Sequence, residues 1–331
     1  MNPLICLYED RETHVVAVKL LIISIRKFHP ELTIRLHFPS PNISFKTWIE
    51  NIPNIELITK ALEGTGSYNI KPHVLIDGLR TGAKTCLWLD TDIILDSRIT
   101  WLADLPEQTL VSTLDPHSYP NGSNFRAEAF DLEPQKNAID GAINSALVLV
   151  DEVHKDFLED WAKLLKLPQY QDSQKKPVSL RNTLMLGDQD ALSALVASKK
   201  YASLKVLLLK HPNDILHHQG ISALTFRQRL ILKNSDRHPS IIHAMASTKP
   251  WLMKNNVSPF LNIRDYYTRI FLELSPYVCT ARQYEKLLTE DKSWLRVQTV
   301  YSKFMLFIFR NDPFAAGALQ ALVQQILKKL V

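Results

Sequence analysis

Short apolar runs alternate with amphipathic stretches over the first 95 residues, and this alternation constrains the fold more than any other feature of the chain. Runs of strand length lie at 4–8, 33–38, 55–59 and 85–95. Helical spacing of apolar residues lies between them, at 13–28, 45–52 and 70–79. Strands that alternate with helices predict an α/β protein whose sheet is largely parallel.

The pattern continues and then changes near residue 255. Two further strands are expected at 109–114 and 146–150, a helix at 153–165 and a polar loop at 170–178. Beyond 255 only helical patterns occur, at 263–274, 281–288, 294–309 and 315–330. The sequence therefore predicts an α/β domain over 1–255 and a helical C-terminal extension over 256–331.

Charge and cysteine content exclude several classes of protein. Lys and Arg number 39 and Asp and Glu 34, so the net charge of +5 is far from that of a nucleic-acid-binding chain. Cys6, Cys86 and Cys279 are too few and too widely spaced for a disulfide framework, which favours a reducing compartment, the cytoplasm. No signal peptide and no apolar run of spanning length is found, so we expect no membrane span.

Two aspartates end the most apolar expected strand. Asp90 and Asp92 follow Trp88-Leu89, and side chains two apart on a strand point to the same side, with Cα atoms about 6.5 Å apart. A hard divalent cation such as Mn²⁺ or Mg²⁺ would offset their repulsion. In the alternative interpretation, one carboxylate caps a loop and the other is solvated. Glycine-rich phosphate loops are absent from the sequence, so a nucleotide must be held by other means.

Three weaker motifs contain polar groups beside apolar runs. His243 follows an apolar lead and precedes Lys249-Pro250-Trp251; an imidazole and an ammonium suit a metal and a diphosphate, although such a histidine is more often structural. The run 188–190, Asp-Gln-Asp, precedes an apolar helix, where either acid could cap the helix or face a sugar. Asn144-Ser145 is a similar polar pair before a strand.

Taken together and in this order, the motifs resemble those of the retaining glycosyltransferases of the family-8 type. That family includes bacterial lipopolysaccharide galactosyl- and glucosyltransferases and glycogenin. The resemblance covers roughly residues 4–253 and rests on these segments: Leu7-Tyr8-Glu9-Asp10, Tyr68-Asn69-Ile70-Lys71-Pro72, Trp88-Leu89-Asp90-Thr91-Asp92, Asn144-Ser145-Ala146, Asp188-Gln189-Asp190-Ala191-Leu192, and His243 through Lys249-Pro250-Trp251.

The resemblance implies a GT-A fold, which is a Rossmann-like mixed sheet, and an enzyme that moves a hexose from a UDP-sugar to a saccharide or lipid-linked acceptor with retention. It implies a Mn²⁺ or Mg²⁺ site made by Asp90, Asp92 and His243. Donor contacts are implied for Tyr8, Glu9, Asp10, Lys71, Asp90, Thr91, Asn144, Ser145 and Lys249. Catalytic roles are implied for Gln189, Asp188 and Asp190. Retention needs either a covalent intermediate on a nucleophile or same-face attack by the acceptor. Gln189 is a poor nucleophile, either acid could act as one, and the sequence does not choose between the two routes.

The sequence departs from the family at two positions and leaves alternatives open. Ala246 and Ala146 stand where the family usually has glycine, so the donor either sits differently or is another sugar nucleotide. The rivals are a sugar-nucleotide-binding protein without turnover and a phosphatase of the haloacid-dehalogenase type. The last helix, 315–331, has an apolar stripe that we expect to pack on the protein; the alternative is peripheral contact with an anionic membrane.

Overall fold

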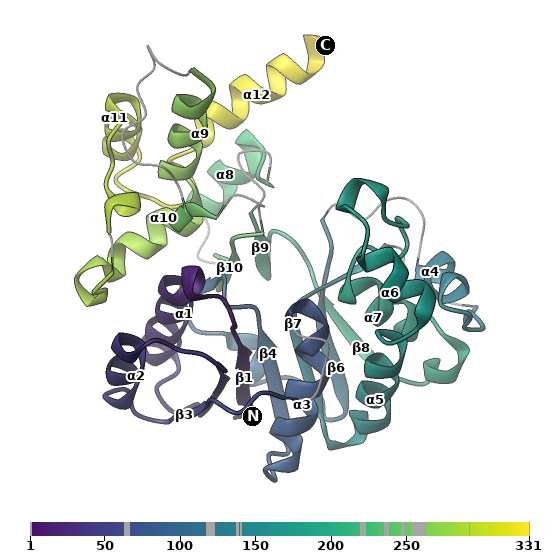
Figure 1. Cartoon of the computed structure of the whole chain (residues 1–331). Helices are drawn as coiled ribbons and strands as arrows, with labels where there is room; N and C mark the ends of the chain where they lie inside the picture. The colour runs from purple at the N-terminus through teal and green to yellow at the C-terminus, as the bar shows by residue number, and fades with distance from the viewer. Residues whose placement is uncertain are drawn as a thin grey trace. The chain divides into compact units, whose positions relative to one another are not determined.

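The computed structural model describes residues 2–62, 67–116, 123–136, 139, 141–218, 223–234, 238–245, 249–252, 263–290 and 292–330. The chain forms two compact units (Figure 1). The first contains residues 1–12, 31–90 and 100–211, and the second contains 13–30, 91–99 and 212–331. The division near 255 that the sequence predicts remains a prediction, because the helices beyond 255 share a compact unit with earlier segments.

The first unit is built on a seven-stranded mixed sheet, which confirms the α/β class. Its strand order is β3-β2-β1-β4-β7-β6-β8, and β7 is antiparallel to both of its neighbours while the other pairs are parallel. The strands are β1 (Leu4–Tyr8), β2 (Ile34–His37), β3 (Ile55–Ile58), β4 (Thr85–Leu89), β6 (Thr109–Leu114), β7 (Ile143–Asp151) and β8 (Lys205–Leu209).

The helices of this unit are α2 (Ile43–Glu50), α3 (Lys71–Arg80), α4 (Ser123–Ala129), α5 (Lys155–Leu164), α6 (Pro168–Gln174) and α7 (Asp188–Val196). The core includes buried side chains of the sheet and of α3, α5 and α7, among them Trp88, Val148 and Trp161. Helix α3 lies close to β1 and β4 because Gly78 faces them: a Cβ there would stand 2.7 Å from the Cys6 sulfur.

The topology brings several chain segments to one edge of the sheet. Strands β1, β4 and β6 end at this edge, and the antiparallel β7 begins there, since Leu114 pairs with Ile143 and Leu89 with Leu147. Helices α3 and α7 precede strands that run toward this edge, so their N-termini lie beside it. The amide of Asp90 donates to the carbonyl of Ala146 at 2.8 Å. Residues that follow β4 and residues that start β7 are therefore neighbours.

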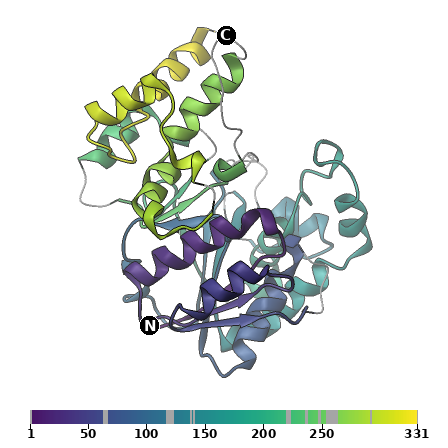
Figure 2. The same ribbon diagram turned by 60° about the vertical axis from the view of Figure 1, so that its left-hand side comes forward.

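The second unit contains a three-stranded sheet and most of the C-terminal helices. Strand β10 (Ile241–His243) is antiparallel to β5 (Ile93–Leu95) and parallel to β9 (Ile215–His217). Helix α1 (Val15–Phe28) packs on β5, where the Leu95 amide donates to Ser24 Oγ at 3.0 Å. The remaining helices gather in the green-to-yellow part of the chain (Figure 2): α8 (Phe226–Lys233), α9 (Ile263–Glu273), α10 (Pro276–Ala281), α11 (Val300–Ile308) and α12 (Ala318–Leu330).

Four expected elements differ from the structure. The helix expected over 294–309 begins only at Val300 as α11, because Thr299 caps it there by accepting the Ser302 amide, and Ser293–Leu295 form a separate 3₁₀ turn. The run 85–95 was expected to be one strand; residues 90–92 interrupt it, and its halves pair in different sheets as β4 and β5. Most of the expected loop 170–178 is helical, because α6 begins at Pro168 and ends at Gln174. The expected helix 281–288 is a 3₁₀ helix, Arg282–Leu287, that continues α10. Within the described residues, no helix is long and apolar enough to cross a bilayer.

Candidate functional site

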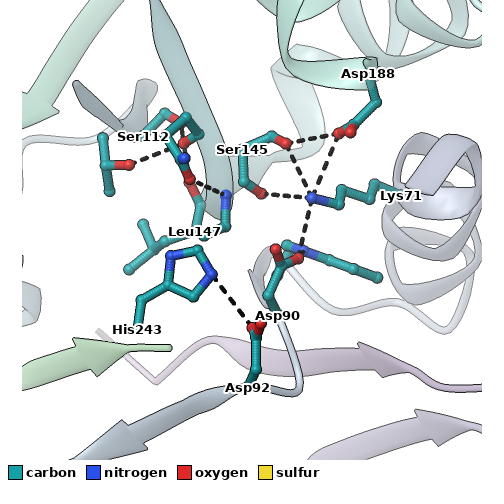
Figure 3. A network of polar contacts seen from close by, with 12 residues as sticks. Lys71, Asp90, Asp92, Ser112, Ser145, Leu147, Asp188 and His243 are labelled. Atoms are coloured by element: carbon teal, nitrogen blue, oxygen red, sulfur yellow. Dashed lines mark hydrogen bonds and ion pairs between the residues drawn. The ribbon is translucent and has the colours of Figure 1, made fainter. Parts of the chain in front are cut away.

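Lys71 is the central cation of a buried polar cluster at the sheet edge of the first unit (Figure 3). Its Nζ lies 3.0 Å from Asp90 Oδ1 and 3.4 Å from Asp188 Oδ2, and it donates to the hydroxyl and carbonyl of Ser145. Burial alone would lower the pKa of Lys71, but the two carboxylates outweigh this effect and raise the pKa to about 12. The ammonium is therefore charged at neutral pH and joins three sequence motifs.

Asp188 is the first residue of α7, and 5% of its surface is exposed. Ser145 Oγ donates to its Oδ2 at 2.6 Å. Burial raises the pKa of Asp188, and the opposing effects of Lys71 and Ser145 do not cancel the rise. A buried carboxylate held by one ammonium and one hydroxyl is well ordered for contact with a polar ligand.

Gln189 and Asp190 have different surroundings although they are adjacent. Gln189 Nε2 donates to Asp115 Oδ2 at 3.2 Å. Asp190 accepts the Arg126 guanidinium on one oxygen and the Leu186 and Gly187 amides on the other. The capping interpretation thus applies to Asp190, whose two oxygens hold the turn that begins α7.

The end of β1 forms a tight polar turn. Glu9 Oε1 accepts the amides of Asp10 and Arg11, and both of its oxygens bind the Arg11 guanidinium. Tyr8 donates its hydroxyl to Asp10 Oδ2, and burial together with Asp10 raises the pKa of Tyr8 to about 12. Glu9 is 1% exposed whereas Asp10 is exposed, so Asp10 is the acid of this turn that faces solvent.

Asn144 and Ser145 occupy the start of β7 at the same edge. Asn144 Oδ1 accepts the amide of Ala146 at 3.0 Å, and the Asn144 carbonyl accepts the Thr113 hydroxyl at 2.8 Å. These local bonds fix the strand entry, and they place Ser145 against Lys71. Of the predicted residues in the first unit, the structure thus brings together Lys71, Asp90, Ser145 and Asp188.

The second unit contains the other two residues of the predicted metal motif, Asp92 and His243. His243 ends β10, and its Nε2 lies 3.2 Å from Asp92 Oδ1 (Figure 3). Lys249 Nζ donates to Asp92 Oδ2 at 2.6 Å and to the Ala244 carbonyl at 2.7 Å. Burial opposes ionisation of Asp92, but His243 and Lys249 outweigh it and hold the pKa of Asp92 well below its usual range. Ala246 lies outside the described residues.

The loop after β4 connects the Lys71 cluster of the first unit to the Asp92 contacts of the second unit along the chain. Asp90 ends a segment of the first unit and Asp92 belongs to the second, with Thr91 alone between them; Thr91 is 5% exposed. Asp92 and His243 of the second unit offer a carboxylate and an imidazole, and Asp90, the third residue of the predicted metal motif, stands two positions before Asp92 in the chain. This set of hard oxygen and borderline nitrogen ligands is compatible with a divalent cation.

Comparisons with known proteins give structural likenesses only: the chain matches no family model and no curated protein. It is similar to the bifunctional glycosyltransferase WbbM in its apo form, with 14% identity, 76% of this chain and 47% of WbbM covered, and a TM-score of 0.49. The chain thus spans about half the length of WbbM.

Two further solved structures are similar to this chain. One is the galactosyltransferase LgtC in complex with donor and acceptor sugar analogues, which is 16% identical to this chain. The match covers 80% of this chain and 94% of LgtC, with a TM-score of 0.46. The other is the glycosyltransferase GlyE of Streptococcus pneumoniae, which is 14% identical to this chain. The match covers 87% of this chain and 64% of GlyE, with a TM-score of 0.45. All three likenesses have identities of 16% or less and TM-scores below 0.5.

Sequence reasoning missed three residues of these clusters. Asp115 directly follows β6, so a carboxylate at the end of an expected strand was the available signal. Arg126 lies on α4, and its partner Asp190 is 64 positions away, so no local pattern reveals the pair. His217 ends β9, and its Nδ1 lies 2.9 Å from Nδ1 of His243. A three-residue strand has too little pattern to be placed from sequence.

Proposed function

We propose that the protein is a retaining glycosyltransferase of the family-8 type with a GT-A fold, which transfers a hexose from a UDP-sugar to a saccharide or lipid-linked acceptor in a reaction that depends on a divalent cation. The observation that carries the proposal is the meeting of Asp90, Ser145 and Asp188 on Lys71. These residues come from three motifs that are far apart in the chain. If the motifs had only structural roles, residues of all three would not need to contact the same buried Lys71 ammonium.

We propose that Asp90, Asp92 and His243 hold the cation, with Mn²⁺ or Mg²⁺ as the metal. The cation, when bound, neutralises the negative charge that develops on the departing diphosphate. We propose that Lys249 binds a diphosphate oxygen, since its ammonium contacts Asp92, a proposed ligand of the cation. Lys71, Tyr8, Asp10, Thr91 and Asn144 are proposed to bind the nucleotide and sugar, and Glu9 to hold the turn after β1.

On the sugar side, the bond between the anomeric carbon and the diphosphate oxygen breaks, and its electron pair leaves with the diphosphate. The anomeric carbon becomes electron-poor, and a carboxylate can stabilise or attack it. We propose Asp188 for this role and Gln189 as a contact to the sugar. Asp190 is proposed to support the turn before α7, since both of its oxygens are already bonded. Covalent and same-face routes both remain compatible with this arrangement.

Two exposed apolar faces support a proposal about the acceptor. On α11, the side chains of Val300, Phe304 and Phe307 are 78%, 56% and 82% exposed. On α12, three residues of the apolar stripe that was expected to pack, Leu319, Val323 and Ile326, are 40 to 51% exposed, whereas Ala318 and Ala321 beside the stripe are buried. Exposed aromatic and aliphatic groups beside Lys303 and Arg310 suit an anionic membrane surface. We propose peripheral membrane contact, which would bring the enzyme to a lipid-linked acceptor.

The experiment that tests the proposed activity is donor hydrolysis without an acceptor. The full-length protein is incubated with a panel of UDP-hexoses and Mn²⁺, and UDP release is measured. We expect slow release from at least one donor, and no release after chelation of the metal. UDP binding with no release from any donor would favour the alternative function, a sugar-nucleotide-binding protein without turnover. The phosphatase alternative predicts phosphate release from phosphomonoesters instead.

A further inference from the structure

A second buried histidine contacts the histidine of the proposed cation site. His217 and His243 end the neighbouring parallel strands β9 and β10 and are register partners. Their Nδ1 atoms are 2.9 Å apart, their ring centroids are 5.2 Å apart, and the rings are inclined at 75°. His217 is 0% and His243 5% exposed, so water does not separate the rings. The other nitrogen of His243, Nε2, is the atom that faces Asp92.

The chemistry of imidazole limits where the protons of this pair can lie. A hydrogen bond between two nitrogens contains one proton, so one Nδ1 donates and the other accepts. A metal ligand needs a free lone pair, and a neutral imidazole has only one N–H. If Nε2 of His243 binds a cation, the proton of that ring is on Nδ1. In that state His217 Nδ1 must be the acceptor.

We propose that His217 is a positioning residue for the cation site: its Nδ1 accepts the hydrogen bond from Nδ1–H of His243 and so keeps Nε2 of His243 free for the metal. This inference rests on the proposed function, because it requires the cation. Histidines that bind metals usually donate their other N–H to a fixed acceptor, and loss of that acceptor lowers metal affinity by about 10- to 100-fold. Here β9 supplies the acceptor, and the strand register fixes its position.

The test compares Mn²⁺ affinity of the full-length chain and of two variants by calorimetry. His217→Phe keeps a planar ring but has no acceptor, and we expect its Mn²⁺ affinity to fall about 10- to 100-fold. His217→Asn places a carboxamide oxygen near the Nδ1 position, and we expect it to bind Mn²⁺ within a few-fold of wild type. Equal affinity of wild type and His217→Phe, or equal losses in both variants, would overturn the inference but leave the proposed function intact.

A second measurement does not depend on the stability of any variant. ¹⁵N spectra of the wild-type chain with Mg²⁺ report which nitrogen of His243 carries the proton. We expect Nδ1 of His243 to be protonated and Nδ1 of His217 to be unprotonated; the reverse assignment would overturn the inference. Absence of Mn²⁺ and Mg²⁺ binding by wild type would overturn both the inference and the cation dependence in the proposed function.

Discussion

The ammonium of Lys71 lies 3.0 Å from Asp90 Oδ1 and 3.4 Å from Asp188 Oδ2, so a single buried cation joins the end of β4 to the start of α7. Trp88 strengthens this connection, since its indole donates to the same Asp90 oxygen at 2.7 Å. Two carboxylates from distant segments are held together at the edge of the sheet. Lys71 is 3% exposed, so this ion-pair cluster is largely shielded from water.

Removal of this charge should destabilise the fold. In Lys71→Met the carboxylates of Asp90 and Asp188 lose their shared cation, and breaking a buried ion pair costs about 3–5 kcal/mol. Urea denaturation followed by circular dichroism measures the change. Lys71→Arg, which keeps the charge, is the matched control and should lose less. A Lys71→Met variant as stable as wild type would mean that the cluster contributes little to folding.

Lys249 should matter for the nucleotide diphosphate. Lys249→Ala removes an ammonium that we place against the leaving diphosphate, and a lost charge-assisted bond should weaken UDP binding about tenfold or more. Calorimetry with UDP and Mn²⁺ provides the measurement. Lys205→Ala, at an exposed position on β8, is the control and should bind UDP as wild type does. Unchanged UDP affinity in Lys249→Ala would count against the diphosphate role.

Gly78 should be required for the close packing of α3. In Gly78→Ala the new methyl group would stand 2.7 Å from the Cys6 sulfur and 2.8 Å from the Cys86 sulfur, so α3 must shift. Such overpacking costs about 1–3 kcal/mol, which urea denaturation would detect. Gly187→Ala is the control, because nothing lies within 4 Å of a Cβ there. Similar stability of the two variants would show that α3 adapts freely.

Much of the sheet could be predicted from the sequence because its strands are continuous apolar runs. β1 and β6 have the expected bounds, and β2, β3 and β7 differ from them by one to three residues at an end. The break between β4 and β5 was not predicted, because apolar periodicity alone does not reveal where a run changes its partner. Residues 90–92 interrupt the ladder, and the aspartates that interrupt it are the residues proposed to bind the cation.

The polar clusters were harder to predict than the strands. Lys71, Asp90, Ser145 and Asp188 were all singled out by motif. That Lys71 joins the other three follows only from the topology, which places the N-termini of α3 and α7 at the same edge. The expected loop 170–178 is largely helical because Pro168 opens α6, and only Tyr170 and Ser173 of that helix are buried. Because this segment is mostly polar, it has no apolar periodicity that would have predicted a helix.

The exposed face of α11 should determine any membrane binding. Flotation with vesicles rich in anionic lipid should carry the full-length protein, since Phe304 and Phe307 can insert while Lys303 and Arg310 contact headgroups. Phe307→Glu, at a side chain that is 82% exposed, should abolish flotation without loss of stability. Ile43→Glu, on the exposed surface of α2, is the control and should float as wild type does. Failure of the wild-type protein to float removes the membrane proposal.

The most direct test of the central claim is UDP release by the wild-type protein and by Asp92→Asn, each freed of metal and then titrated with Mn²⁺. Asp104 is an exposed acid outside the Lys71 cluster and the proposed cation site, so Asp104→Asn controls for the loss of one negative charge. We predict that wild type and Asp104→Asn hydrolyse a UDP-hexose only when Mn²⁺ is present, and that Asp92→Asn is inactive at every Mn²⁺ concentration while its melting curve remains cooperative. Hydrolysis by Asp92→Asn at the wild-type rate would contradict the account. So would wild-type hydrolysis at the same rate with and without Mn²⁺.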